Sequence, residues 1–600
     1  MKRSNIKVNL IIICLFGIAA CLILLIPQIR QVIIKLTEQF LMRRALRDQA
    51  KWHQVLFTIS IIGSIFFGLF LLYFLFDCKK FVIKILKIVC SFLNNCKYYL
   101  NNCKYYLNNC KYFLNNCKYL IYMKNEIQKV FCKNIIIAIL CMFGLYTFAI
   151  IGIIRADFIY KDDLGRTIYG YRGWENYSRY MSNFLAVFLH ADTHINNISP
   201  FPQIIAAIFI AIASVLLVYI ISDGKVTKTA LFLALPIGLS PYFLECFSYK
   251  FDSPYMALSV LASIVPFLFM RNYSVFSVSS IILLLIMCMT YQASSGIYVI
   301  IVIMLCFKMW NERVKPGKEI IKFAAVSASS YCASMFFFRV FLMHNTNTYR
   351  STDVYPINRL VSGIVNNFIS YMRLVNEDFG FIWKFLLLIL CSTFIITSVF
   401  FIKRNKIAVL TVSLMAITAM CLMSFGVYLA FTEVMSPPRG MYGFGVFIAC
   451  IAVYLSNMPK KIILLPAILL CWCFFVFSFT YGNALSEQKR YNNFRTEILL
   501  HDLSILFPNK TQEQLLIRLE NSEGFAPSIQ NISIRNPVIR RLVPVNLMAN
   551  WYWSNIILTR YYNFNLQQDE SIEENELNEV LNTYYHTIKS DGRKVLVILK

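Results

Sequence analysis

Apolar residues in this chain come in blocks of about 20, and short polar stretches separate one block from the next. Inside hydrocarbon every backbone polar group must be satisfied within its own segment, so such blocks predict helices rather than a barrel of alternating strands. The pattern predicts a mainly α-helical, polytopic membrane protein with about 11 to 13 spans. The candidate spans are roughly 8–27, 55–76, 134–154, 202–222, 229–247, 253–270, 274–291, 293–308, 320–342, 380–402, 407–430, 438–456 and 462–480.

The last part of the chain has a different pattern. Apolar residues recur at helical spacing between Tyr491 and Leu503. Nearer the end, the apolar runs 585–588 and 595–599 flank a polar turn, as in a β-hairpin. The pattern therefore predicts a small water-soluble α/β domain over 481–600.

The region before residue 134 is predicted to be an N-terminal extension. After its two apolar segments, the unit Leu-Asn-Asn-Cys-Lys-Tyr-Tyr recurs four times over 93–120 with small variations. On a helix this unit aligns Leu and Cys along one seam, which suits self-association or a lipid surface; a tolerated cytoplasmic repeat expansion explains it without any role. The predicted organisation is an extension over 1–133, a transmembrane domain over 134–480 and a C-terminal domain over 481–600.

Lysine and arginine predict the orientation of the bundle. From the third span onward, five successive loops on one side are basic, and basic loops face the cytoplasm. The opposite connections are then external, above all 155–201, 248–252, 343–379, 431–437 and the C-terminal domain. The loop between the first two segments is also basic and does not fit this rule, which is consistent with one of those segments lying on the membrane surface.

Composition narrows the class of partner. Hydrophobic residues make up 58% of the 600 and charged residues 15%, which excludes an ordinary soluble protein. The net charge of +27 could suggest nucleic acid, but the cations lie mostly in short loops and in the repeat, so we expect contact with membrane lipids and not with nucleic acid. The 19 cysteines avoid 155–201 and 481–600, so no disulfide framework is predicted.

The first external stretch carries the first candidate chemistry. Asp162 and Asp163 follow a span by a few residues, at the level where a lipid-linked substrate presents its head group. In glycosyl transfer a carboxylate takes the proton from the attacking hydroxyl while a cation neutralises the phosphate leaving group. Arg166 and Arg179 are candidates for that phosphate, with Trp174 as a further substrate-binding candidate. The same Asp-Asp pair is also typical of a solvated loop or a helix cap.

A second cluster spans the next external turn. Glu245 lies near the end of a predicted span, and ionisable groups at such depth are costly enough to suggest function. Tyr249, Lys250 and Asp252 follow within the same turn. We therefore predict Glu245 and Asp252 as catalytic, and Tyr249 and Lys250 as substrate-binding. The alternative is that Glu245 pairs with Lys250 or an arginine and ties the bundle together.

Smaller features complete the candidates. Gln292 lies between two spans, and Arg439, near the start of the penultimate span, either binds phosphate or extends toward the interface. His190 and His194 have the i, i+4 spacing that can hold a metal, but without a plain third ligand no metal site is predicted. Carboxylates beside a phosphate substrate suit Mg²⁺ or Mn²⁺ as readily as no metal, so a divalent cation stays open as a cofactor.

Several of these features together resemble a known family, the serotype-converting O-antigen glucosyltransferases of bacteria. The resemblance covers about residues 134–600 and is most specific at 241–258; Lys250 stands where we expect an arginine. The residues that carry it are Asp162 and Asp163 with Arg166, Gly173 and Trp174, Arg179, Pro-Phe-Pro-Gln at 200–203, Pro-Tyr-Phe-Leu-Glu at 241–245, Ser-Tyr-Lys-Phe-Asp-Ser at 248–253, Met-Ala-Leu at 256–258, and Tyr-Gly-Asn-Ala-Leu at 481–485 with Gln488.

The resemblance implies a GT-C type enzyme of the bacterial inner membrane with its site and C-terminal domain in the periplasm. Such an enzyme takes glucose from undecaprenyl phosphate and attaches it to the O-antigen of lipopolysaccharide. Asp162 and Asp163 would hold or activate the acceptor, and Glu245 and Asp252 would complete the acidic site. Two alternatives stay open: a transporter or flippase of a lipid-linked saccharide, and an O-antigen polymerase.

Overall fold

The computed structural model describes residues 118–600, except for 313–314, 344–352, 401–403, 509–513 and 562–564. The segments predicted at 8–27 and 55–76, and nearly all of the repeat, lie outside the described residues. The chain divides into two units, Met1–Cys132 and Lys133–Lys600. The described part of the first unit contains helix α6 (Lys118–Val130). The second unit contains the bundle, the candidate site and the C-terminal sheet.

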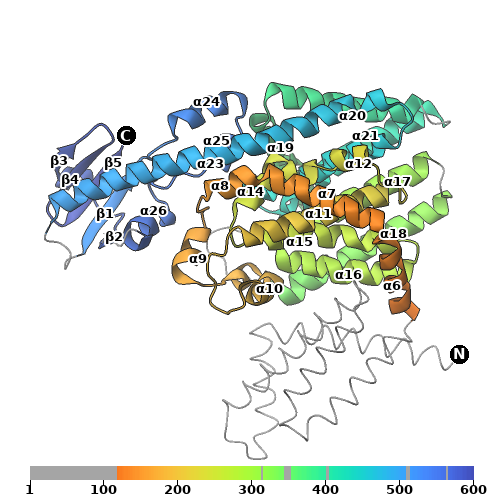
Figure 1. The fold of residues 1–600 in the computed structure, drawn as a ribbon, viewed down its shortest axis with the longest axis horizontal. Helices are drawn as coiled ribbons and strands as arrows, with labels where there is room; N and C mark the ends of the chain where they lie inside the picture. Colours follow the sequence, from red (N-terminus) through yellow and green to blue (C-terminus); the bar gives the residue numbers. More distant parts are fainter. Residues whose placement is uncertain (1–117, 313–314, 344–352, 401–403, 509–513, 562–564) are drawn as a thin grey trace, which may run out of the picture. The chain divides into compact units, whose positions relative to one another are not determined.

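Apolar helices of the second unit form the bundle that the apolar blocks predict (Figure 1). The helices and short helical turns of this part are α7 (Lys133–Ala149), α8 (Ile151–Ala156), α11 (Phe201–Ile221), α12 (Lys228–Leu233), α13 (Pro236–Leu239), α14 (Pro241–Ser248), α15 (Ser253–Ile264), η3 (Val265–Phe269), α16 (Tyr273–Thr290), η4 (Gln292–Ser294), α17 (Ser295–Asn311), α18 (Gly317–Phe337), η5 (Phe338–Leu342), α20 (Phe381–Phe400), α21 (Lys406–Met423), η6 (Gly426–Ala430), η7 (Pro438–Gly440), α22 (Gly443–Ser456), η8 (Lys461–Leu464) and α23 (Leu465–Leu506).

In the described residues, seven helices are long and apolar enough to cross a membrane, or up to nine if two bent helix pairs each count as one span. The blocks predicted at 253–270 and 438–456 form shorter apolar helices. The block predicted at 229–247 bends by 62° before α14. At that bend Ser240 has an extended backbone and Pro241 has no N–H to continue the helix. The protein is mainly helical and multi-pass, and the described residues contain seven to nine candidate spans. The count of 11 to 13 stays a prediction, because two of the predicted spans lie outside the described residues.

A close contact between two glycines joins α8 to α23. A Cβ added to Gly482 would lie 2.4 Å from the carbonyl carbon of Gly152, so only glycine lets the two backbones approach this closely. The contact fixes the start of the first external stretch against the middle of α23. That stretch folds into α9 (Asp163–Tyr169), η2 (Trp174–Tyr177) and α10 (Tyr180–His190).

The predicted external stretch 343–379 contains a helix that the sequence pattern did not indicate, α19 (Leu360–Asp378). It buries Asn367 and Tyr371 on one side and exposes apolar residues on the other. Asn367 donates to the carbonyl oxygens of Leu429 and Phe431 at 3.0 and 2.7 Å. The helix therefore braces the segment that leads to η7.

The C-terminal domain does not begin at a break near residue 481, because α23 continues from the bundle into it without interruption (Figure 1). Its five strands form a mixed sheet in the order β2-β1-β5-β4-β3. The predicted hairpin is confirmed: β4 and β5 pair antiparallel, with His586 opposite Leu599. The elements are β1 (Leu515–Glu520), α24 (Pro527–Arg535), α25 (Ile539–Leu542), α26 (Tyr552–Ile556), η9 (Ile557–Tyr561), β2 (Leu566–Gln568), η10 (Glu574–Glu576), β3 (Asn578–Asn582), β4 (His586–Ser590) and β5 (Lys594–Leu599).

Candidate active site

The Asp252 carboxylate is fully engaged by two side chains from the first external stretch. Arg166, on α9, donates from Nη1 to Oδ2 at 2.8 Å, and the indole of Trp174 donates to Oδ1 at 2.5 Å. The Arg166 guanidinium also lies 4.4 Å from the centre of the Trp174 ring. All three side chains are buried. Buried charges persist when they are paired and hydrogen-bonded, and Asp252 meets both conditions.

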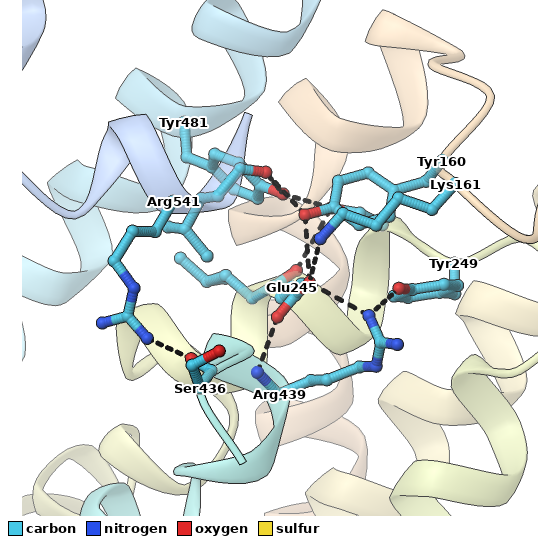
Figure 2. Close-up of polar contacts among 11 residues, drawn as sticks. Tyr160, Lys161, Glu245, Tyr249, Ser436, Arg439, Tyr481 and Arg541 are labelled. Atoms are coloured by element: carbon cyan, nitrogen blue, oxygen red, sulfur yellow. Dashed lines mark hydrogen bonds and ion pairs between the residues drawn. The ribbon is translucent and has the colours of Figure 1, made fainter. Parts of the chain in front are cut away.

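Glu245, on α14, is the centre of a second compensated cluster (Figure 2). Its Oε1 accepts from Lys161 Nζ at 2.9 Å, from the Tyr160 hydroxyl at 3.2 Å and from Arg439 Nη1 at 3.3 Å. Its Oε2 accepts from the backbone N–H of Arg439 at 2.6 Å. Arg439 also donates to the Tyr249 hydroxyl. One buried carboxylate thus holds two cations in place.

Asp163 is the first residue of α9 and is fully buried. Its Oδ2 accepts the backbone N–H of Lys250 at 2.7 Å, while Oδ1 has no hydrogen-bond partner among the described residues. Burial, and then the charge of Asp252, raises the pKa of Asp163 to about 8. The carboxyl group is therefore mostly protonated at neutral pH.

Asp162 differs from the other three predicted carboxylates. It is half-buried, and its side chain makes no hydrogen bond or ion pair with a residue that the structure describes. Its charge still acts on its neighbours: burial, and then Asp162, raises the pKa of Tyr177. Although burial opposes it, the charges of Asp252 and then Asp162 raise the pKa of Arg166. Asp162 is the carboxylate of this group whose side chain has no hydrogen-bond or ion-pair partner among the described residues.

Arg179 resembles Asp162 in one respect: it forms no ion pair with a carboxylate in the described part of the chain. Its Nε donates to the Gln292 side chain at 3.4 Å, and Gln292 donates to the carbonyl oxygen of Tyr177 at 3.1 Å. The Arg179 guanidinium lies 4.4 Å from the ring centre of Tyr291 and 5.3 Å from that of Tyr177. Burial has the largest effect on the pKa of Tyr177 and raises it; the charge of Asp162 raises it further, and that of Arg179 lowers it. Asp162 and Arg179 therefore both lie near Tyr177.

The remaining predicted residues lie deeper. Lys250 is buried, and its Nζ donates to the carboxylate and the carbonyl oxygen of Asp157. It does not pair with Glu245, which pairs instead with Lys161 and Arg439. The structure thus separates a buried layer of Asp163, Arg166, Trp174, Glu245, Tyr249, Lys250 and Asp252 from a half-exposed layer of Asp162, Arg179, Gln292 and Arg439.

The two histidines considered for a metal have packing contacts. The His190 ring stacks on Phe251 with centroids 5.7 Å apart. The His194 ring lies so close to Gly170 that a Cβ there would approach it to 2.0 Å. Among the residues that the structure describes, no three His, Cys, Asp or Glu side chains form a group that could hold a metal ion.

Comparison with known proteins identifies the stretch that carries this site. Residues 151–439 match the sequence model of the family described as Glucosyl transferase GtrII. This part of the chain belongs to the GtrII family. Over 436 residues the chain is 26% identical to a protein of Salmonella phage P22 described as an uncharacterized 55.3 kDa protein in the gtrB 5' region, and the match covers 69% of this chain and 87% of the phage protein. No solved structure matches the chain.

The match confirms the predicted family, and it spans every predicted site residue from Asp162 to Arg439. The chain is therefore a membrane protein with a stretch of the GtrII glucosyl transferase family. The C-terminal domain lies beyond the stretch that the family model matches.

Sequence reasoning missed two parts of the candidate site. Tyr160 and Lys161 directly precede the Asp-Asp pair, and that adjacency was a usable signal. The other part comes from α25, where the carbonyl oxygen of Leu542 accepts from the Tyr160 hydroxyl at 2.6 Å. Next to it, Arg541 donates to the Asp378 carboxylate and to a carbonyl oxygen of the segment before η7 (Figure 2). No local pattern marks these residues, which lie far along the chain from the Asp-Asp pair.

Proposed function

We propose that this GtrII-family protein transfers glucose from undecaprenyl phosphate to the O-antigen of lipopolysaccharide at the periplasmic face of the bacterial inner membrane. The family match supports glucose transfer, and the apolar helices support a membrane-bound donor. The basic loops on the opposite side of the bundle support the periplasmic placement of the site. Presentation of the sugar on a lipid removes the need for a nucleotide-binding loop.

In the proposed step, Asp162 is the general base. It accepts the proton of an acceptor hydroxyl, whose oxygen forms a bond to the anomeric carbon of glucose. The bond from that carbon to the phosphate oxygen breaks, and the electron pair leaves with undecaprenyl phosphate. Arg179, which has no ion-pair partner among the described residues, stabilises the charge on the phosphate. No step is routed through a divalent cation.

The other predicted residues take supporting roles in this proposal. Trp174 and Arg166 hold Asp252, and Lys161 and Arg439 hold Glu245, so both carboxylates fix the loop that carries Asp162. Gln292 positions Arg179, and the exposed ring of Tyr177 offers an apolar face for a sugar. The observation that carries the proposal is a carboxylate and a guanidinium that both act on Tyr177 within the GtrII match and form no ion pair among the described residues.

The test is the mass of O-antigen repeat units from cells with and without the protein, in a strain that makes polyprenyl-phosphate glucose. We expect one added hexose per repeat with the wild type, none with Asp162→Asn, and one with the control Glu433→Gln, which changes an exposed carboxylate outside the site. Unchanged repeats with altered chain length would instead indicate a polymerase. No change in either property would favour transport of a lipid-linked saccharide or another acceptor, and both results contradict the proposal.

A further inference from the structure

A polar pocket of about 490 Å³ lies between the end of α8 and the middle of α23, apart from the side chains assigned to transfer. Its volume is in the range of small-molecule sites. Two arginines, a lysine, two asparagines and a serine supply most of its polar surface. These residues are Arg155, Asn483, Ser486, Lys489, Arg490 and Asn493, with Ala156 and Glu487 completing the lining.

The charges of the pocket favour an anion. Arg155 donates to the Asn483 side chain and forms no ion pair with a carboxylate in the described residues. Lys489 donates to the carbonyl oxygen of Asp157 at 2.8 Å and approaches its carboxylate to 3.3 Å. Arg490 pairs with Glu487 at 3.1 Å on an exposed face of the helix. Three cations therefore face one lining carboxylate, and Arg155 is uncompensated.

An aromatic surface continues from the pocket along α23 and along α7, the helix that precedes α8 in the chain. Phe475 and Phe479 precede Asn483 by eight and four residues on α23, so the three share one face. Phe148, on α7, is 56% exposed, and its ring lies 6.2 Å from that of Phe475 and 5.4 Å from that of Phe479. Trp472, 54% exposed, stacks on Phe475 at 5.8 Å. We call these four rings the aromatic ridge.

We propose that this pocket binds the phosphate head group of a membrane lipid whose apolar chain lies along the aromatic ridge. Arginine and asparagine side chains suit phosphate oxygens, and the pocket lies where the apolar part of α23 ends, at the level of lipid head groups. None of the lining residues belongs to the transfer site, although Asp157 bridges Lys489 of the pocket to Lys250 of the buried layer. The inference goes beyond the proposed transfer reaction and is tested without it.

The test uses the full-length protein in maltoside micelles, which contain no phosphate. Two lipid phosphates with a photoreactive group in the chain, a phosphatidic acid and an isoprenoid phosphate, are crosslinked, and the modified peptides are mapped by mass spectrometry. We expect adducts around Phe148 and around Phe475 with at least one probe, and the ratio of the two assigns the lipid class. The matching uncharged probes, diacylglycerol and isoprenol, should label these peptides about tenfold less.

The variant Arg155→Gln with Arg490→Gln should reduce labelling of the ridge by both charged probes about tenfold. Arg535→Gln with Arg593→Gln makes the same change of charge on exposed residues elsewhere and should leave labelling unchanged. Equal labelling by charged and uncharged probes would overturn the proposal, and this comparison needs only wild-type protein. Complete displacement of the lipid probe by low concentrations of inorganic phosphate would assign the pocket to free phosphate and overturn the lipid assignment.

Discussion

The buried and half-exposed layers of the site differ in how their charges are compensated. In the buried layer, Glu245 holds two cations and Asp252 accepts from a guanidinium and an indole. In the half-exposed layer, Asp162 and Arg179 have no ion-pair partner among the described residues, and Arg439 pairs with Glu245 of the buried layer. Residues of both layers come from the same short stretches of sequence, so residue type alone does not separate them.

This difference suggests that the buried layer stabilises the site and that the half-exposed layer takes part in the reaction. Taking charges out of water is expensive, so those in the buried layer are paired, and removal of one partner leaves the other uncompensated. A general base must instead be free to accept a proton, and a phosphate-binding cation must have donors to offer. We therefore expect substitutions in the buried layer to change stability first, and substitutions in the half-exposed layer to change rate first.

The largest expected effect is on catalysis. Asp162→Asn keeps the shape of the side chain but removes the proposed base, so kcat should fall by roughly 10²–10⁴ with little change in the thermal unfolding temperature. Asp163→Asn, which replaces a carboxyl group already mostly protonated at neutral pH, should lose far less activity. Transfer of glucose from a purified lipid donor measures both. Equal losses in the two variants would remove the distinction between the adjacent aspartates.

The second expected effect is on stability. Glu245→Gln leaves Lys161 and Arg439 without their shared carboxylate, so the free energy of unfolding should fall by about 3–5 kcal/mol. Glu433→Gln, at an exposed position, is the matched control and should change it little. Thermal unfolding in detergent measures the difference. A Glu245→Gln protein with normal stability and no activity would move Glu245 from the supporting layer to the reacting one.

Some parts of the fold can be predicted from the sequence, and others cannot. Apolar blocks predict helices well, because crossing a bilayer requires long runs of apolar residues. They do not reveal the bend before α14, which depends on the extended backbone at Ser240. Nor do they reveal α19, an amphipathic helix in a stretch expected to be a connection. Nor do they show that α23 runs without interruption through residue 481, where the C-terminal domain is expected to begin.

The sequence predicted which residues belong to the candidate site, but not which of them pair with one another. The pattern placed Asp162, Glu245 and Arg439 on one side of the membrane, but it could not say which carboxylate is compensated. Pairing depends on contacts between distant segments, such as Glu245 with Arg439, or Tyr160 with the carbonyl oxygen of Leu542. Such contacts leave no trace in the local spacing of residues. Only the structure therefore distinguishes the carboxylates that have partners from Asp162.

The third prediction concerns the hydrogen bond from Trp174 to Asp252. Trp174→Phe keeps an aromatic ring but removes the indole N–H, so the protein should lose about 1.5–3 kcal/mol of stability, as expected for a hydrogen bond to a charged group. Trp383→Phe is the matched control, because it also shortens a buried indole but breaks no described hydrogen bond. Equal losses in the two proteins would mean that ring size, and not the bond to Asp252, matters.

The last expected effect is a pH dependence that originates at Asp163. An unfolded aspartate ionises near pH ~3.9, whereas burial and the charge of Asp252 raise the pKa of Asp163 in the folded protein to about 8. Between these values the folded state binds one more proton than the unfolded state. This contribution to stability is therefore fully present below about pH 4 and is lost as the pH rises through about 8, at no more than about 1.4 kcal/mol per pH unit.

Asp163→Asn removes the titrating group, so its thermal unfolding temperature should fall less steeply than that of the wild type between pH 5 and 8. The comparison must be the difference between the two proteins, because other groups titrate in the same range. A parallel decline would mean that Asp163 is ionised in the folded state. Its burial would then require a cation that the described contacts do not provide, and Asp163 would join Asp162 as a candidate base.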